Sequence, residues 1–516
     1  MLVKTYGGAL NGVDALTVTI EVNATRGTML TIVGLADTAI KESGERVRSA
    51  IVQSGYEFPH RNVVVNLAPA DIRKEGAAYD LPIAVAMLAA AETVSAPELD
   101  RYFIMGELSL DGTVLPVRGV LPMAITARAQ GFKGMIVPAA NATEAAVVDS
   151  INVYGVNNLR EVLEFLQGSR VLVPTVVDTR AEFARALVAG GPDFADVKGQ
   201  ENVKRAFEVA CAGGHNIILV GPPGSGKSMM AKRLPSIMPP LTLREALETT
   251  KIHSVAGKLG HNARLMATRP FRAPHHTISP VAMVGGGSNP MPGEISLAHN
   301  GILFLDEFPE FPRGVLEVLR QPLEDKVISV SRARYAVDYP ASFMLVASMN
   351  PCPCGYYTHP TRRCTCLPGA VSRYKNRISG PLLDRIDIQV EIQPVPFDTL
   401  SSEPDGEPSS CIRERVIAAR AVQTARFRDV PGVHCNAQME SAQLREYCRI
   451  DDASMAMLRT AIERFDMSAR AYTRILRVAR TIADLDGSRD IAGRHISEAI
   501  GYRNLDRSTW GSQPSL

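Results

Sequence analysis

The eight residues from Gly221 to Ser228 constrain this chain more than any other stretch. They match G-x-x-x-x-G-K-[ST], a pattern in which glycines let backbone N–H groups curl around phosphate. Residues 216–220 predict a buried strand before the loop, and residues 229–234 predict a helix after it. The residues predicted to bind nucleotide phosphates are Gly221, Pro222, Pro223, Gly224, Ser225, Gly226, Lys227 and Ser228. Lys227 is expected to reach the β and γ phosphates, and the Ser228 hydroxyl is expected to bind Mg²⁺.

A second apolar run, residues 301–305, predicts a strand that ends in two carboxylates, Asp306 and Glu307. Asp306 is predicted to hold Mg²⁺, and Glu307 is predicted to orient and polarise the attacking water. A third apolar run, residues 343–348, precedes Asn350, which is predicted to sense the γ phosphate. The alternatives are a strand that merely ends at an acidic turn and an asparagine that only caps its strand.

Four of the eight cysteines lie within 15 residues: Cys352, Cys354, Cys364 and Cys366. Four thiolates suit tetrahedral Zn²⁺, so this segment is predicted to hold a structural zinc ion. The C-x-C spacing is tighter than the usual C-x₂-C, and four reduced thiols in a proline-rich loop are the alternative. The adjacent pair His275 and His276 is not expected to bind one metal, because neighbouring side chains on a strand point to opposite faces.

The composition is that of an ordinary globular protein, with 46% hydrophobic and 21% charged residues. The longest apolar stretch, residues 81–91, contains a proline and is too short to span a bilayer. We therefore expect a cytoplasmic protein with no membrane partner. The net charge is only +2, so any binding to nucleic acid must come from a local basic patch. Arg332 and Arg334, in a predicted hairpin over residues 326–337, are the residues expected to grip DNA.

The first 170 residues alternate strand-like and helix-like runs, which predicts an α+β or α/β domain. Residues 74–82 and 106–119 resemble the proteolytic domain of Lon proteases. That resemblance implies the Lon-like fold. The position of the Lon serine nucleophile is occupied by Ala78, and that of the lysine base by Met123. Neither side chain can act as nucleophile or base, so proteolysis is not expected.

Nearly the whole chain resembles the ComM/YifB family of magnesium-chelatase-like AAA+ ATPases, most closely at residues 34–43, 270–276 and 379–387. The resemblance implies an α/β AAA+ core with a C-terminal helical lid, a homohexameric ring, ATP as the nucleotide, and a helicase that drives branch migration of DNA during natural transformation. It also implies that Arg385 reaches into the neighbouring subunit's nucleotide site, and that Arg470, with Arg474 next in line, senses nucleotide from the lid. A surface ion pair is the alternative for Arg385, and an exposed helix arginine for Arg470.

The expected organisation is a Lon-like N-terminal domain over 1–170, a linker over 171–195, an AAA+ core over 196–400, a linker over 401–411, a helical lid over 412–505 and a tail over 506–516. Two functions are expected from different classes. One is a motor that translocates single-stranded or branched DNA in transformation or recombination. The other is a magnesium-chelatase-type motor subunit that acts on a protein partner. The N-terminal domain and the four-cysteine segment favour the DNA motor.

Overall fold

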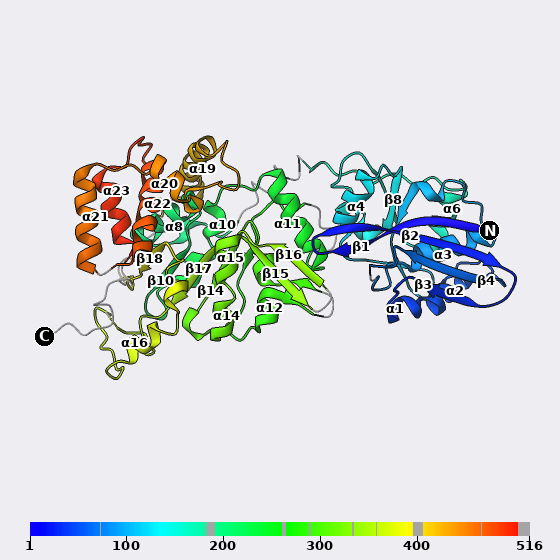
Figure 1. Cartoon of the computed structure of the whole chain (residues 1–516), viewed down its shortest axis with the longest axis horizontal. Helices are drawn as coiled ribbons and strands as arrows, with labels where there is room; N and C mark the ends of the chain where they lie inside the picture. The colour runs from blue at the N-terminus through cyan, green and yellow to red at the C-terminus, as the bar shows by residue number, and fades with distance from the viewer. Residues whose placement is uncertain are drawn as a thin grey trace. The chain divides into compact units, whose positions relative to one another are not determined.

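The computed structural model describes residues 1–72, 74–179, 181, 183, 191–260, 265–287, 290–332, 335–357, 359–395, 406–465 and 467–503. Arg334, the tail over 506–516 and parts of both expected linkers lie outside the described residues. The chain divides into two compact units. The first contains residues 1–187, 242–267 and 290–292, and the second contains 188–241, 268–289 and 293–516. The helices and strands of both units are labelled in Figure 1.

The first unit is built on a sheet of seven strands among its described residues, in the order β3-β4-β2-β1-β5-β8-β9. Strands β1, β2 and β4 pair antiparallel, whereas the other neighbours pair parallel, so the sheet is mixed. Burial alternates along β2, as expected for a strand with one face on a core. The bounds are β1 Leu2–Asn11, β2 Asp14–Thr25, β3 Leu30–Val33, β4 Asn62–Ala68, β5 Tyr102–Ile104, β8 Gly134–Pro138 and β9 Asn152–Val156, with a small hairpin of β6 Glu107–Leu108 and β7 Val114–Leu115.

The longest apolar stretch of the sequence forms helix α3, Asp80–Ala90, in which every residue is buried. The neighbouring helices are α1 Thr38–Lys41, α2 Ser43–Gln53, α4 Val120–Ala129, α5 Ala139–Ala145 and α6 Leu159–Leu166, with the short η1 Leu99–Arg101. Helix α11, Leu243–Val255, comes from the middle of the chain yet belongs to this unit. The Ser254 carbonyl accepts a hydrogen bond from the Gly119 N–H at 3.2 Å, and the Ser254 hydroxyl donates to the buried carboxylate of Glu144. Part of the stretch between the two nucleotide-binding motifs is therefore packed with the N-terminal sheet.

The second unit is built on a parallel sheet in the order β11-β14-β17-β10-β18. Its strands are β10 Ile217–Val220, β11 Phe271–Arg272, β14 Ile302–Leu305, β17 Met344–Met349 and β18 Ile388–Glu391. Strands β10, β14 and β17 are buried along their whole length, which explains why they appear in the sequence as continuous apolar runs. The carboxyl ends of parallel strands share one edge of a sheet, and ligands of such folds bind at that edge.

The helices of the second unit include α8 Glu201–Gly213, α9 Lys227–Ala231, α10 Leu234–Ile237, α12 Pro280–Val284, α13 Glu294–Leu297, α14 Arg313–Glu317, α15 Arg320–Asp325, α16 Ala370–Lys375 and α17 Gly380–Leu383. Strands β15 Val327–Arg332 and β16 Tyr335–Pro340 form an antiparallel hairpin. The remaining short elements are β12 Gly285–Gly286, β13 Met291–Pro292 of the first unit, η2 Phe194–Asp196 and η3 Phe308–Glu310.

The C-terminal part of the second unit is helical and shares its core with the parallel sheet. Its elements are α19 Ser409–Arg426, α20 Ser441–Tyr447, α21 Asp452–Phe465, α22 Ala469–Leu485, α23 Gly493–Gly501 and η4 Asn436–Gln438. Buried residues of α22 such as Ile475 and Ile482 recur at helical spacing and join the same cluster as Phe207 of α8. These helices follow the parallel-sheet part in sequence, as predicted for the lid region.

Several local predictions are confirmed. The strand-like and helix-like runs expected to alternate over the first 170 residues are present, among them the strands β2, β3, β4 and β8 and the helices α2, α3 and α4. Strand β1 was not predicted, because Gly7 and Gly8 weaken a strand pattern. A Cβ at Gly8 would lie 2.9 Å from Met123 Cγ, so close packing explains that glycine. Among the described residues, none of the helices combines the length and apolarity of a membrane span.

Candidate functional site

The phosphate-binding loop joins the end of β10 to the start of α9, as the sequence predicts. Gly224 and Gly226 have φ of +76° and +86°, values that glycine adopts far more readily than other residues. Helix α9 begins at Lys227, directly after Gly226. The Ser225 hydroxyl is buried and has no hydrogen-bond partner among the described residues, so this loop has a polar group to offer a ligand.

The Lys227 ammonium lies inside this loop and is largely buried. It donates to the carbonyls of Gly221 at 2.7 Å and Pro222 at 2.8 Å, and it lies 3.3 Å from Asn350 Oδ1. Burial lowers the pKa of Lys227, against the opposing effect of the Asp306 and Glu307 carboxylates. A cation held by neutral carbonyls in a partly dry loop is well placed to bind an anionic phosphate.

Asp306 follows strand β14 and is bound by hydroxyls from both neighbouring motifs. Ser228 Oγ donates to Asp306 Oδ2 at 2.5 Å, and the Ser348 hydroxyl donates to Oδ1. Hydroxyl and carboxylate oxygens are hard ligands of the kind that Mg²⁺ prefers beside phosphates, and here one of each lies in the same place. The two residues predicted to bind Mg²⁺, Ser228 and Asp306, are therefore in direct contact.

Ser348 was not singled out from the sequence. It lies on β17 two residues before Asn350, which directly follows the strand, and the alternation of extended backbone favours the same side for residues two apart. That spacing is the signal from which Ser348 could have been found. Asn350 itself directly follows β17, the strand between β14 and β10, and its contact with Lys227 links the end of β17 to the phosphate-binding loop.

Glu307 has φ of +54°, a left-handed conformation that costs a non-glycine residue about 1–3 kcal/mol and that clusters at functional sites. Its side chain is 54% exposed, and Oε2 lies 3.2 Å from His276 Nδ1. The rings of His275 and His276 lie 4.1 Å apart, so these neighbours are not on opposite faces of a strand as expected. The prediction that the two side chains point to opposite faces was wrong, because His275 and His276 lie outside any strand. His276 contacts the predicted catalytic carboxylate instead.

Arg385 follows helix α17 and is buried. Its guanidinium donates to the Pro381 carbonyl at 2.6 Å and pairs with Glu324. Its Nε has no partner among the described residues. The contacts described for this side chain are thus with its own helix and with α15, not with the phosphate-binding loop of the same chain.

Arg470 lies near the start of α22, and its side chain is 64% exposed. It pairs with Asp384 at 3.1 Å. One turn later, Arg474 pairs with Asp387, a buried carboxylate that also lies 3.3 Å from His215 Nδ1. Burial alone would raise the pKa of Asp387, but Arg474 and His215 hold it well below its ordinary value. Arg470 and Arg474 therefore both contact the segment that carries Arg385.

The four predicted zinc ligands gather in one place, with all sulfur atoms within 4.8 Å of one another. Cys352 Sγ lies 3.3 Å from Cys354 Sγ and 3.8 Å from Cys364 Sγ, and Cys354 lies 3.5 Å from Cys364. Tetrahedral zinc with Zn–S bonds of about 2.3 Å places its sulfurs about 3.8 Å apart, so this donor set and spacing fit Zn²⁺. Among the described residues, no other group of three or more possible ligands has this proximity.

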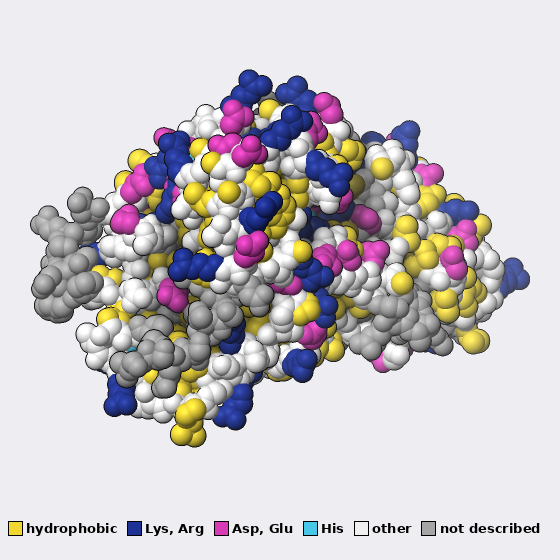
Figure 2. All heavy atoms as spheres, turned by 60° about the vertical axis from the view of Figure 1, so that its left-hand side comes forward, with side chains coloured by type: hydrophobic (Ala, Val, Ile, Leu, Met, Phe, Trp, Pro, Cys, Tyr) yellow, Lys and Arg dark blue, Asp and Glu magenta, His cyan; other side chains and the backbone are white. Residues whose placement is uncertain are grey.

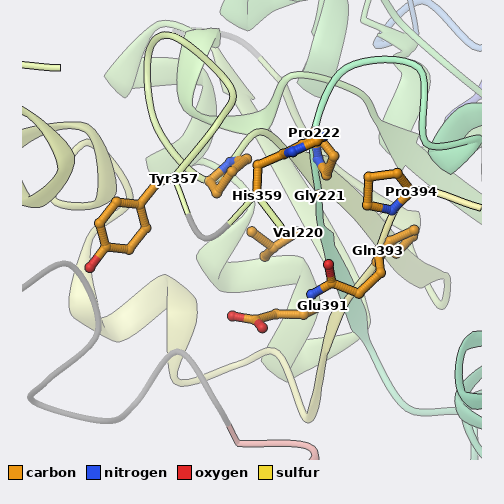
Figure 3. A pocket seen from close by; sticks show the side chains of 10 residues that line it. Val220, Gly221, Pro222, Tyr357, His359, Glu391, Gln393 and Pro394 are labelled. Atoms are coloured by element: carbon orange, nitrogen blue, oxygen red, sulfur yellow. The ribbon is translucent and has the colours of Figure 1, made fainter. Parts of the chain in front are cut away.

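A small pocket lies on one side of the phosphate-binding loop (Figure 3). The loop contributes Gly221 and Pro222, and the cysteine-containing segment contributes Tyr357 and His359. Residues 391–394, which end and follow β18, form the remaining wall. The cysteine-containing segment therefore shares a surface with the nucleotide-binding loop.

In the first unit, the two stretches that resemble Lon lie together. The Gly106 N–H donates to the Ala78 carbonyl at 2.9 Å, and the Gly106 carbonyl accepts from the Leu81 N–H at 3.0 Å. Met123 is buried in α4. Neither Ala78 nor Met123 provides a nucleophile or a base at this place.

Lys227→Ala tests the phosphate-binding loop. The substitution removes a cation expected to make charge-assisted hydrogen bonds with phosphate, each worth about 1.5–3 kcal/mol. ATP affinity should therefore fall by about 10-fold or more, measured by titration with a fluorescent ATP analogue. Lys232→Ala, which changes an exposed lysine after helix α9, is the control and should bind normally. Equal affinity of Lys227→Ala and the wild type would contradict the assignment.

Three family models cover most of the chain. Magnesium chelatase subunit ChlI matches residues 193–400, a second ChlI model matches 20–141, and the ChlI C-terminal model matches 406–503. The chain is 45% identical over 499 residues to the protein YifB of Salmonella typhimurium, covering 96% of each chain. It is 43% identical over 507 residues to the competence protein ComM of Haemophilus influenzae, covering 97% of each. A shorter similarity, 29% over 142 residues, relates 26% of this chain to 16% of a Lon protease of Protochlamydia amoebophila.

Proposed function

This chain belongs to the ComM/YifB family of magnesium-chelatase-like AAA+ proteins, and we propose that it is a ring-forming ATPase that couples ATP hydrolysis to movement along DNA. The ATPase proposal rests on the group of side chains gathered at the edge of the parallel sheet. There Ser228 contacts Asp306 at 2.5 Å, and Lys227 lies 3.3 Å from Asn350. The similarity to the competence protein ComM, over 97% of its length, supports a motor role in competence, and we propose branch migration of DNA during natural transformation or recombination as the task.

The residues of this site divide the work of hydrolysis. Lys227 and the loop backbone would bind the β and γ phosphates of ATP, and Ser228 and Asp306 would hold Mg²⁺, which supplies charge neutralisation at the phosphates. Glu307 would orient the attacking water, and Asn350 would contact the γ phosphate. Arg385 of one subunit would complete the site of the next in a homohexamer, and Arg470 would report the nucleotide state from the lid. ATP and DNA as substrates imply a cytoplasmic location.

The proposed DNA-binding element, or DNA grip, is the hairpin of β15, Val327–Arg332, and β16, Tyr335–Pro340. It directly follows α15 and leads, through residues 341–343, into β17, the strand that ends at Asn350. Ile328, Val330 and Tyr339 are buried, so the base of the hairpin is anchored in the second unit. A hairpin joined to the strand of the predicted γ-phosphate sensor can respond to hydrolysis. The sequence places Arg332 and Arg334 at its tip.

A local site of DNA binding is favoured because the chain carries little net charge. On the face shown in Figure 2, Lys and Arg side chains lie among Asp and Glu side chains rather than in one basic field. Together with a net charge of +2, this favours a few concentrated contacts with the phosphate backbone.

The double substitution Arg332→Ala/Arg334→Ala should weaken DNA binding and flatten its salt dependence. For every phosphate that the protein no longer neutralises, the slope of log K against log salt should fall by about 0.7–0.9. Basal ATPase activity should persist, because neither residue is expected to touch nucleotide. The measurement is DNA binding titrated over salt concentration, with Arg362→Ala/Arg363→Ala as a control that removes two exposed arginines from another loop. An unchanged salt slope would rule out this hairpin as the grip.

A magnesium-chelatase-type motor subunit is the second candidate function, supported by the matched ChlI models. Such a motor would act on a protein partner, so DNA would not stimulate its ATPase activity. ATPase rates with and without branched DNA therefore distinguish the two functions.

For the organisation of the chain we propose a Lon-like domain over 1–170, an AAA+ core over 196–400 and a lid over 412–505, with linkers at 171–195 and 401–411 and a tail over 506–516. The contact of the two Lon-like stretches at Gly106 and the partial similarity to a Lon protease support the N-terminal assignment. Because Ala78 and Met123 replace the catalytic pair, this domain would position the motor or its DNA rather than cut peptides.

We also propose that Cys352, Cys354, Cys364 and Cys366 hold one structural Zn²⁺. Protein purified without chelator should contain about one zinc per chain, measured by metal analysis. Cys364→Ser/Cys366→Ser should lose it, whereas Cys411→Ser, which changes an exposed cysteine outside the cluster, should keep it. Zinc-free wild-type protein that regains no zinc on reconstitution would contradict the proposal.

A further inference from the structure

The cysteine cluster is joined to the nucleotide site by the chain itself. Cys352 comes two residues after Asn350, at the end of β17. The carbonyl of Met349, the last residue of that strand, accepts a hydrogen bond from the Gly221 N–H at 3.2 Å. One short segment therefore connects the first residue of the phosphate-binding loop, the predicted γ-phosphate sensor and the first cysteine.

The segment also packs on the loop from outside. Gly355 has φ of +83°, and a Cβ there would come within 2.6 Å of Cδ of Pro223. Only a residue without a side chain can approach the loop this closely in this conformation. Pro223 is the third residue of the phosphate-binding loop, so the glycine backbone lies directly against that loop.

The cysteines fix the turn that carries Gly355. The Gly355 N–H donates to the Cys352 carbonyl at 3.0 Å, and the Tyr357 N–H donates to Cys352 Sγ at 3.3 Å. Cys364 and Cys366, at the other end of the segment, lie within 4.8 Å of Cys352 and Cys354. One metal ion would therefore close the whole segment, including His359, which lines the pocket beside Gly221 and Pro222 (Figure 3).

We propose that the metal-filled cysteine cluster positions the phosphate-binding loop, so that nucleotide affinity depends on the metal. Zinc holds the turn at Gly355, and the turn holds Pro223 from outside. When the metal is removed, the segment loses its closure and the loop loses this support. This inference rests on the proposed ATP and zinc sites. It adds that the metal at the zinc site controls the affinity of the ATP site for nucleotide.

Two glycine substitutions separate the effect of the contact between Gly355 and Pro223 from the effect of the metal. Gly355→Ala keeps all four cysteines but places a methyl group against Pro223. Gly369→Ala is the matched control, because Gly369 has a similar φ of +76° with nothing within 4 Å of an added Cβ. Both variants carry the same backbone strain, and only Gly355→Ala pushes on the loop.

The measurement is the affinity for a fluorescent ATP analogue with Mg²⁺, paired with zinc content and circular dichroism of each preparation. Gly355→Ala should keep one zinc per chain and bind nucleotide about tenfold more weakly than the wild type. Gly369→Ala should match the wild type in both respects. Wild-type protein stripped of zinc, and Cys364→Ser/Cys366→Ser, should show the same loss of affinity, and zinc should restore it only in the stripped wild type.

The outcomes distinguish this inference from the proposed function. Wild-type protein that binds no nucleotide would overturn the ATPase proposal and this inference with it. Wild-type protein that binds nucleotide equally well with and without zinc would overturn this inference alone. Equal affinities of Gly355→Ala and Gly369→Ala, each with zinc bound, would also overturn it.

Discussion

Glu307→Gln should bind ATP with near wild-type affinity and hydrolyse it at least about 10²-fold more slowly. General-base groups of this kind contribute about 10²–10⁴-fold to rate, and glutamine keeps the shape of glutamate without the charge that polarises water. Binding should persist because Lys227, Ser228 and Asp306, the residues proposed to contact phosphate and Mg²⁺, are unchanged. Single-turnover hydrolysis and equilibrium nucleotide binding, measured on the same preparation, separate the two effects.

The matched control for this variant is Glu310→Gln. Glu310 lies three residues away, is also exposed, and pairs with Arg377 at 2.6 Å rather than with a residue of the nucleotide site. The Glu310→Gln variant should hydrolyse ATP at the wild-type rate. If Glu307→Gln also hydrolyses ATP at the wild-type rate, the water-activating role belongs to another residue.

Arg385→Ala should bind ATP but lose about 10³-fold or more in hydrolysis rate, the range expected when an arginine finger is removed. The side chain contacts Pro381 and Glu324 of its own chain, so the proposed role in catalysis would be exerted on the site of a neighbouring subunit. The ATPase rate per subunit of the wild type should therefore rise with protein concentration as rings assemble. Steady-state ATPase measurements over a concentration series give both quantities.

Mixing inactive variants tests whether Arg385 acts between subunits. Lys227→Ala subunits retain Arg385, and Arg385→Ala subunits retain an intact phosphate-binding loop. A mixture should therefore regain activity at interfaces where the first donates Arg385 to the second. Arg377→Ala, which removes a nearby exposed arginine, is the control and should be active alone. Rings that form in the mixture without any recovery of activity would count against a role between subunits.

The elements that carry the nucleotide site were accessible from sequence because their signals are local. Strands β10, β14 and β17 are buried on both faces and appear as continuous apolar runs. Strand β10 leads into the phosphate-binding loop, and the predicted site residues Asp306 and Asn350 directly follow β14 and β17. The cysteines were accessible for the same reason, since all four lie in one short segment. The structure shows in addition that the four sulfur atoms lie within 4.8 Å of one another.

The contacts that were not predicted depend on residues far apart in the chain. The pairing of His276 with Glu307 joins positions 31 residues apart, and Arg474 pairs with Asp387 across 87 residues. Helix α11 follows the phosphate-binding loop in sequence but packs in the unit of the N-terminal sheet, which no local pattern indicates. The order of the strands in each sheet could not be predicted for the same reason, because hydrophobic periodicity identifies strands without specifying their neighbours.

ATP hydrolysis at this site is proposed to move DNA, and strand exchange at a labelled branched junction measures that movement. The wild type with Mg²⁺ and ATP should convert the junction to products. Glu307→Gln, which is expected to bind ATP, and the wild type with a non-hydrolysable analogue should leave it intact. An ATPase rate that branched DNA does not change, together with no conversion of the junction by the wild type, would contradict the proposed function.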